Sequence, residues 1–223
     1  ALSQGHSKGW SSFYIVTLFI ISFFSLLLFV IVELNHEQPL LNLRLFKNPI
    51  FSISVLTGSI ITIGLFGGVF LIPLFTQNLL LFTPYQTGLL IMPSALVTAV
   101  MMPVSGLLFD RFGAKALSLI GLFITAWGTW NLSKINLSTS NATIIFDTTI
   151  RSIGMGLAMM PITTAGMNEV PGNLIARASA LNNVIRQVAA SFGIAILTAI
   201  MQNRQAFHYA ILKDSVSVDS TAY

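Results

Sequence analysis

The chain has 223 residues, of which 54% are hydrophobic and only 8% are charged. Soluble domains carry roughly 25% charged residues, and a soluble fold with so few charges would expose apolar surface that aggregates. The composition therefore excludes an ordinary soluble protein and predicts a chain whose solvent is lipid.

The charge and the reactive side chains narrow the class further. The formal net charge is +4, but the basic residues are dispersed, without the stripe or aromatic platform of a nucleic-acid site. The absence of cysteine excludes disulfides and thiolate chemistry. The three histidines show no metal-ligand spacing, and no nucleophile–base pair, carboxylate dyad or phosphate loop is visible. We expect that the protein is not an enzyme and that it has no cofactor and no nucleic-acid partner.

The first predicted membrane element follows a polar loop at residues 1–11, which begins with Ala1 rather than an initiator methionine. Residues 12–32 carry no charge, and about 20 apolar residues span a bilayer as a helix. This helix holds no glycine or proline and is expected to face lipid. A polar linker at residues 33–48 follows it.

Five further helices are predicted in the segment 49–201, which leaves a polar tail without a span at residues 202–223. Their expected ranges are 49–75, 87–109, 116–132, 142–160 and 179–201. The fold class is therefore an all-α polytopic membrane protein with six transmembrane helices. Gly64 and Gly68 in the second helix form a GxxxG step, which allows another backbone to approach closely.

The positive charges predict the orientation. Six spans place both chain ends on one side of the membrane. The connections on the other side carry Arg44, Lys47, Arg111, Lys115 and Arg177, whereas the connections between helices on the side of the chain ends carry only Lys134. Cytoplasmic loops are enriched in lysine and arginine. The richer face is therefore assigned to the cytoplasm, and both chain ends to the outside, with the plasma membrane of a bacterium as the expected location.

One short charged connection carries a family signature. The residues Gly106, Asp110, Arg111, Gly113 and Lys115 resemble the loop motif of the major facilitator superfamily. Three more stretches are similar to the carboxy-terminal half of the EmrB/QacA-type multidrug transporters, namely 71–78 with 85–93, 151–165, and 178–195.

This resemblance implies a partial major facilitator fold. Transporters of this type have fourteen helices, two six-helix halves with an additional pair between them. The chain is similar to the second linker helix and the first five helices of the carboxy-terminal half. The missing amino-terminal half of the same transporter would then be a partner of this chain within a longer protein. The resemblance also implies that the cytoplasmic loop motif takes part in gating, although a purely topogenic role would explain its charges equally well.

Two charges lie well inside the fifth predicted helix. Asp147 and Arg151 are four residues apart, so both can lie on one helix face. Charges inside a membrane helix mark transport routes or structural ion pairs. A role in transport or proton coupling and a permanent structural bridge both remain open. The family pattern includes the arginine but does not require an acid at Asp147.

Weaker candidates line the expected cavity. Met155 and Met159 could offer adaptable apolar contacts to a substrate, and Asn182 with Arg186 could line a cytoplasmic mouth. Ordinary packing or interfacial solvation would also account for them.

The sequence thus predicts a fragment of a multidrug exporter, and the fragment alone is expected to be inactive. The complete exporter would exchange small amphipathic substrates, such as amphipathic cations or similar compounds, for protons. Protons and membrane lipid are then its further partners. A major facilitator transporter for a metabolite, peptide or siderophore is the first alternative, and a non-transporting membrane scaffold or subunit is the second.

Overall fold

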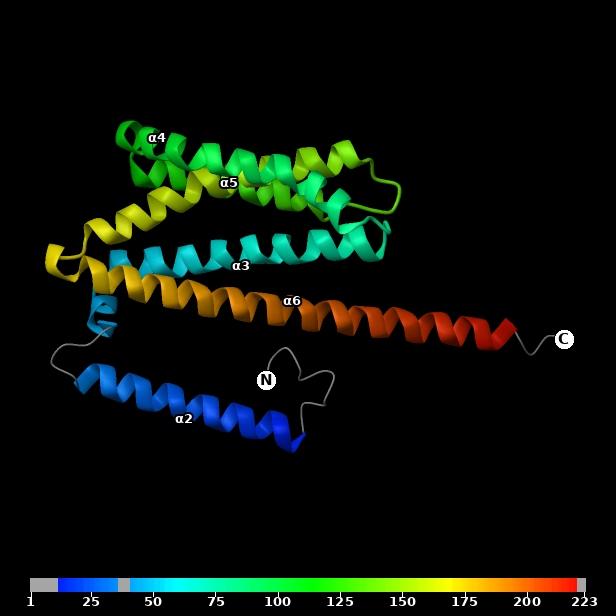
Figure 1. Cartoon of the computed structure of the whole chain (residues 1–223), viewed down its shortest axis with the longest axis horizontal. Helices are drawn as coiled ribbons and strands as arrows, with labels where there is room; N and C mark the ends of the chain where they lie inside the picture. Colours follow the sequence, from blue (N-terminus) through cyan, green and yellow to red (C-terminus); the bar gives the residue numbers. More distant parts are fainter. Residues whose placement is uncertain (1–11, 36–40, 220–223) are drawn as a thin grey trace.

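The computed structural model describes residues 12–35 and 41–219, so the predicted loop 1–11 and residues 36–40 and 220–223 lie outside it. The described residues form helices and no strands. In chain order the elements are α2 (Phe13–Asn35), the 3-10 turn η1 (Leu43–Lys47), α3 (Pro49–Asn78), α4 (Pro84–Leu132), α5 (Asn141–Asn168), the 3-10 turn η2 (Gly172–Leu174) and α6 (Ile175–Asp219). Figure 1 shows these helices running side by side along one axis.

Local capping explains where three of the helices begin. Asn48 accepts hydrogen bonds from the first backbone N–H groups of α3, and Ser140 does the same for α5. Thr83 and Gln86 form a reciprocal capping box at the start of α4. Proline at the first position of α3 and of α4 has no N–H that would remain unsatisfied there. The sequence therefore specifies these helix starts locally.

The described residues form five α-helices rather than six, because the two predicted helices 87–109 and 116–132 are joined across a kink in one element, α4. The two arms of α4 meet at a kink at Gly113, whose φ of 73° and ψ of 166° are not helical. We call residues 84–112 the first arm and residues 114–132 the second arm. Figure 1 shows the second arm folding back along the first.

Helix α5 packs against both arms of α4. Ser105 on the first arm donates a hydrogen bond of 2.9 Å to the carbonyl oxygen of Leu157. On the second arm, a Cβ added at Gly121 would come within 2.7 Å of the backbone nitrogen of Ala158. Small residues therefore allow α5 to lie close to the second arm, as in other membrane helix packings.

Helix α3 lies between α5 and α6, running antiparallel to the first and parallel to the second. Ser54 lies against Gly166 of α5, and ten residues later Gly64 lies against Met155. On the other side, Ile63 packs on Gly193 of α6. A core cluster of Leu45, Phe51, Val55, Val170, Ala178 and Leu181 closes one end of this three-helix contact.

Helix α2 is joined to the bundle at its carboxy-terminal end. The carboxylate of Glu33 accepts a 2.8 Å hydrogen bond from the Leu41 amide, and Arg44 donates one of 3.2 Å to the Leu34 carbonyl oxygen. Most of its large apolar side chains are exposed, as expected of a helix that faces lipid, and it lies apart from the other helices in Figure 1. A groove of about 660 Å³ separates it from α6.

Four helices of the described chain are long and apolar enough to cross a membrane, in α2, α3, α4 and the segment 172–211. A straight α4 would be roughly 74 Å long, more than twice the thickness of a hydrocarbon core, so its bend brings it back within that thickness. Helix α5 is not among the four, although its 28 residues would span about 42 Å; its interior holds two charged side chains.

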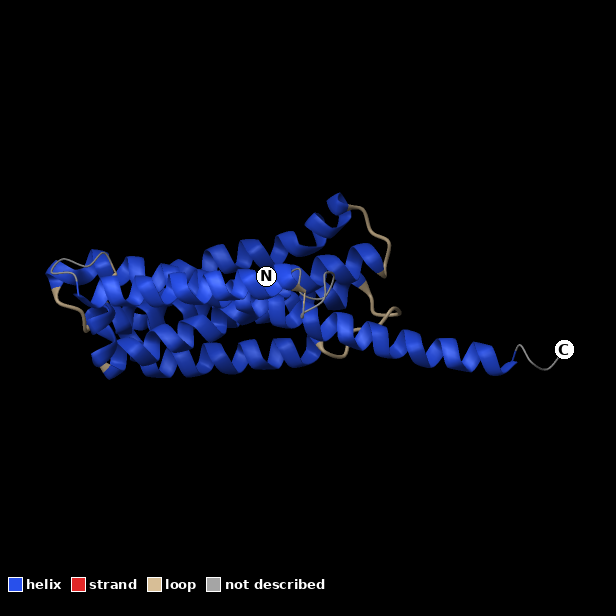
Figure 2. Cartoon of the chain, turned by 90° about the horizontal axis from the view of Figure 1, so that it is seen from below, coloured by secondary structure: helices blue, strands red, loops and turns tan. Residues whose placement is uncertain are grey.

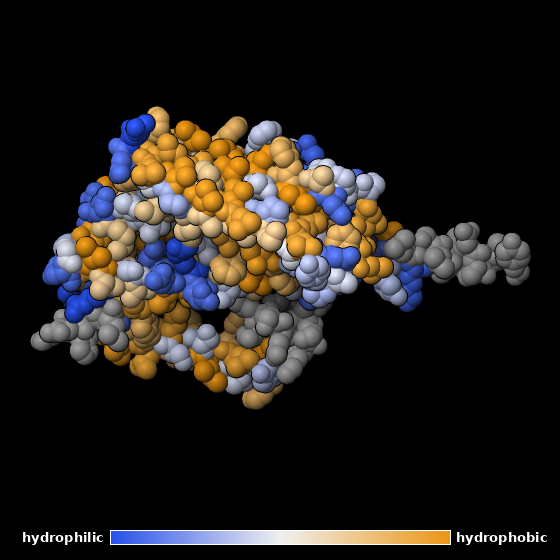
Figure 3. Space-filling view, turned by 45° about the horizontal axis from the view of Figure 1, so that its top comes forward, coloured by the Kyte–Doolittle hydropathy of each residue, from blue (hydrophilic) through white to orange (hydrophobic). Residues whose placement is uncertain are grey.

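The surface agrees with a membrane environment. Apolar side chains cover most of the face in Figure 3, and hydrophilic ones gather toward the left end, where η1, the bend of α4 and η2 lie in Figure 1. The chain is an integral membrane protein. Helix α6 continues as a helix through most of the predicted polar tail, as far as Asp219, and projects beyond the other helices in Figure 2.

Candidate functional site

Arg151 reaches from α5 to the backbone of α3. Its side chain is buried, and its guanidinium donates a hydrogen bond to the carbonyl oxygen of Gly64. In a helix, the side chain of residue i+4 normally covers the carbonyl oxygen of residue i. That position is Gly68, so the oxygen of Gly64 is open to a second donor. The GxxxG step thus receives an arginine side chain rather than a neighbouring backbone.

Glycines hold Arg151 from two directions. A Cβ added at Gly68 would overlap the guanidinium itself. On the second arm of α4, a Cβ at Gly128 would lie 2.8 Å from the Cα of Arg151. The arginine therefore sits in a space that exists only because α3 and α4 carry glycine at these positions.

Asp147 is also buried, with 7% of its surface exposed, one turn before Arg151. The two were expected to be able to meet on one face of the helix. In the described part of the chain no ion pair links them, and the bonding partner of Arg151 is Gly64 on another helix. The structural ion pair considered from the sequence is therefore not present in this conformation, and the carboxylate has no basic partner among the described residues.

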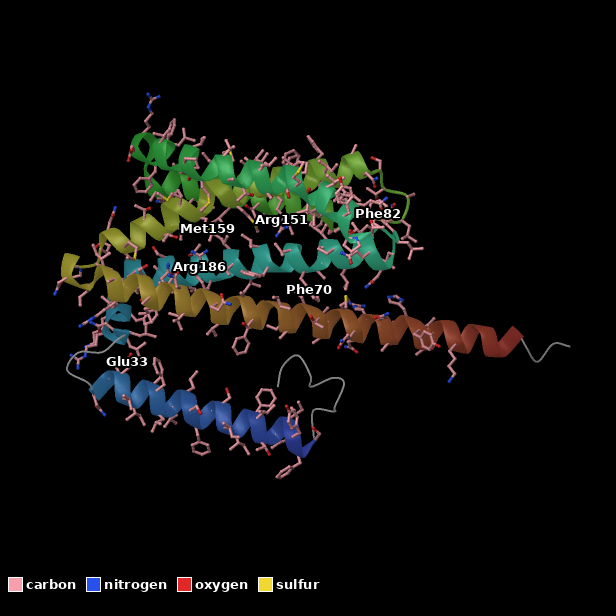
Figure 4. All side chains as sticks on the ribbon, in the orientation of Figure 1. Glu33, Phe70, Phe82, Arg151, Met159 and Arg186 are labelled. Atoms are coloured by element: carbon pink, nitrogen blue, oxygen red, sulfur yellow. The ribbon has the colours of Figure 1, made fainter. Side chains whose placement is uncertain are left out.

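Arg186 enters the same region from α6. Its Nε donates to the Thr62 hydroxyl at 3.3 Å, and its Nη2 lies 3.6 Å from the Met159 sulfur. Figure 4 shows Arg151, Met159 and Arg186 converging on the space between α3 and α5. The structure thus brings together side chains from three helices that the sequence could only name separately.

The other weak candidates lie along the same interface. Met155 packs against Gly64, with its methyl group 3.5 Å from where a Cβ would be. Asn182, one turn before Arg186, is buried and lines a cavity of about 10 Å³ together with Thr163 of α5 and Ser54 of α3. That volume holds about one water molecule. Asn182 therefore lies at the interface of α3, α5 and α6.

The loop motif forms a second, separate group at the bend of α4. Asp110, Arg111 and Lys115 are exposed there, and Gly113 is the residue with positive φ. Gly106 lies on the first arm near Met160 of α5, at 3.9 Å for an added Cβ. The bend lies at one end of the helices, whereas Arg151 lies near their middle (Figure 4). The structure does not bring the two groups together.

Sequence reasoning missed Thr62, which both donates to the Gly58 carbonyl oxygen at 2.8 Å and accepts from Arg186. Its only signal was a polar side chain in the middle of an apolar helix. Serine and threonine commonly satisfy their hydroxyl groups within their own helix, so that signal alone does not identify a partner on α6.

Comparison with known proteins now identifies the family, because residues 3–194 match the family described as "Major Facilitator Superfamily". The chain belongs to the major facilitator superfamily.

Three curated bacterial proteins illustrate what this major facilitator chain is similar to. It is 40% identical to the "Uncharacterized MFS-type transporter YhcA" of Bacillus subtilis over 97% of the chain and 41% of that protein. It is 32% identical to the "Lincomycin resistance protein LmrB" of Listeria monocytogenes over 92% of the chain and 44% of that protein. It is also 32% identical to the "Multidrug resistance protein B homolog" of Mycobacterium tuberculosis, over 74% of the chain and 31% of that protein. The chain thus spans less than half the length of these relatives, whose names are those of transporters and resistance proteins rather than enzymes.

Proposed function

We propose that the chain is part of a secondary active exporter that carries small amphipathic compounds across the bacterial plasma membrane in exchange for protons. The observation that carries the proposal is the group of charged side chains inside the bundle, Asp147, Arg151 and Arg186, in a chain of this family. Charged residues at such depth are costly and face protein or water in transporters. The printed names of two relatives, which refer to lincomycin resistance and multidrug resistance, support the choice of cargo.

The proposed architecture has six membrane crossings. The two arms of α4 cross separately, α5 crosses with its charges turned inward, and α2, α3 and α6 each cross once. The bend at Gly113 then faces the cytoplasm, with η1 and η2 on the same side. In the fourteen-helix arrangement of the EmrB/QacA-type transporters, these are the second linker helix and five helices of the carboxy-terminal half. An amino-terminal half would complete the cavity, and the chain alone would not transport.

Within this architecture the side chains take separate roles. Asp147, buried and without a basic partner in the described chain, is proposed to exchange a proton. Arg151 fixes α5 to α3 through Gly64. Met155, Met159, Asn182 and Arg186 are proposed to line the cavity, and the exposed charges of the bend are proposed to contact other helix ends when the cavity changes its accessible side.

The proposal is tested by efflux from cells that express the complete gene. A panel of amphipathic drugs that includes cationic, neutral and acidic compounds is loaded, and efflux is measured with and without a proton gradient. We expect gradient-dependent efflux of at least one drug class, its loss in Asp147→Asn, and unchanged efflux in Glu169→Gln, which alters an exposed acid at the end of α5.

Two results would contradict the proposal. Uptake of a metabolite or peptide without efflux of any drug would favour the alternative cargo. Full coupling in Asp147→Asn would remove this carboxylate from the proton route. Expression of residues 1–223 alone serves as a further control, because efflux by that chain would show that no second half is needed.

A further inference from the structure

The arginines inside the bundle have only neutral partners. Arg151 donates to a backbone carbonyl, and Arg186 lies next to a hydroxyl and a thioether. None of the acidic side chains that the structure describes forms an ion pair with either of them. A guanidinium carries five N–H donors and stays charged at any accessible pH. Two positive charges and one buried carboxylate, that of Asp147, therefore lie inside the bundle, so the described residues leave at least one guanidinium without a counter-charge.

The two arginines differ in how firmly they are held. Arg151 is 8% exposed and is confined by Gly68 and Gly128, so its guanidinium has one fixed position. Arg186 is half-buried; its contact of 3.3 Å with the Thr62 hydroxyl is long for an N–H···O hydrogen bond, and its other partner, the Met159 sulfur at 3.6 Å, is a weak acceptor. Arg186 can therefore exchange these contacts for a stronger acceptor at little cost, whereas Arg151 cannot.

The surroundings of Arg186 favour an acceptor with an apolar body. Asn182 lies on the same face of α6 one turn away and adds amide donors, and the amide makes no hydrogen bond to the described residues. Met159 contributes a flexible thioether that adapts to different shapes. Met159 of α5 and Arg186 of α6 are in contact, and Figure 4 shows them near one another, with Arg151 further along α5. The group is rich in donors and contains no carboxylate.

We propose that Arg186, assisted by Asn182, binds the acidic group of an organic anion, and that Met159 contacts the apolar part of that molecule. A carboxylate accepts two parallel hydrogen bonds from a guanidinium, an arrangement that a hydroxyl and a thioether cannot provide. The fixed charge of Arg151 adds a favourable field without direct contact. The inference rests on the proposed transport function, because it specifies the chemical class of the cargo as an amphipathic acid.

The test compares three probes with the same ring system, 1-naphthoate, neutral 1-naphthamide and cationic 1-naphthylmethylammonium. Their binding to residues 1–223 in lipid nanodiscs is measured by equilibrium dialysis. We expect naphthoate to bind roughly tenfold more tightly than naphthamide, the effect of about one charge-assisted hydrogen bond, and the cation to bind most weakly. Equal binding of the acid and the amide, or tighter binding of the cation, would overturn the proposal without any variant.

Variants then locate the site. Arg186→Gln is expected to remove the preference for the acid, and Arg186→Lys to retain part of it, because the charge remains but the planar fork is lost. Arg204→Gln, at an exposed position further along α6, is the matched control and should keep the full preference. Persistence of the preference in Arg186→Gln would place the anion elsewhere and contradict the assignment.

A final comparison separates cargo from a permanent partner. If an acidic side chain from another segment of the complete transporter pairs with Arg186, the complete protein will bind naphthoate and naphthamide equally, although residues 1–223 alone discriminate between them. That result would overturn the cargo assignment. Because these experiments measure binding, they do not depend on proton-coupled efflux. A failure of the transport proposal is therefore seen separately, in the efflux assay.

Discussion

The guanidinium of Arg151 on α5 donates a hydrogen bond to the carbonyl oxygen of Gly64 on α3, although 87 residues separate the two along the chain. This contact joins α5, whose interior holds two charged side chains, to α3, which carries no charged side chain. It depends on Gly68, which leaves the carbonyl oxygen uncovered and leaves room for the guanidinium.

The first prediction concerns the space that Gly68 leaves for the guanidinium of Arg151. In Gly68→Ala the new methyl group overlaps the guanidinium, so Arg151 has to abandon Gly64 or α3 has to shift. We expect a loss of unfolding free energy of about 1–3 kcal/mol, as in other overpacked sites. The measurement is reversible unfolding in mixed micelles.

The matched control for this substitution lies on the same helix. A Cβ added at Gly58 meets nothing within 4 Å. Gly58→Ala should therefore be neutral or raise stability by about 0.5–1 kcal/mol, because alanine is the better helix former. Equal destabilisation by both substitutions would show that the space at Gly68 has no special role.

The second prediction concerns the bend of α4. Gly113 has a φ of 73° and a ψ of 166°, a region that residues with a side chain rarely adopt. Gly113→Ala should cost about 1–3 kcal/mol in unfolding free energy. Gly106→Ala, in helical conformation on the first arm with only an ordinary contact of 3.9 Å, is the control and should change stability little. A stable Gly113→Ala variant would mean that the bend does not need this backbone conformation.

The third prediction concerns the contact between α3 and α4. The hydroxyl groups of Thr76 and Thr87 are buried and 3.0 Å apart. A double-mutant cycle with Thr76→Val and Thr87→Val should give a coupling energy of about 0.6 kcal/mol, the average for hydrogen bonds between membrane helices. Strict additivity of the two single effects would show that the two hydroxyl groups do not interact.

Several parts of the fold were predictable because they depend on local chemistry. Apolar runs of sufficient length identified α2 and α3, and the capping residues before α3 and α4 are readable in the sequence. The glycine-containing motif placed a turn at Gly113. What the motif did not reveal was how closely the two helices follow one another: only Gly113 is non-helical between them, so they form the single kinked element α4, and the described residues have five helices where six were expected.

The candidate site was less predictable because its geometry depends on distant residues. The spacing of Asp147 and Arg151 placed both on one helix face, but the direction of the arginine is set by a glycine on α3. The position of Arg186 depends on Thr62, which lies 124 residues earlier in the chain. Periodicity within one helix contains no information about such partners.

The account rests on two membrane crossings by α4 with the bend at Gly113 on the cytoplasmic side. Residues 1–223 contain no cysteine, so within them a single cysteine can be introduced directly; any cysteine elsewhere in the complete gene is first replaced by serine. Lys115→Cys and Lys134→Cys, both exposed, place a thiol at the two ends of the second arm. Intact cells expressing each variant of the complete gene are treated with a membrane-impermeant maleimide, and then again after permeabilisation. The account predicts labelling at position 134 in intact cells and at position 115 only after permeabilisation; labelling at position 115 in intact cells would contradict it.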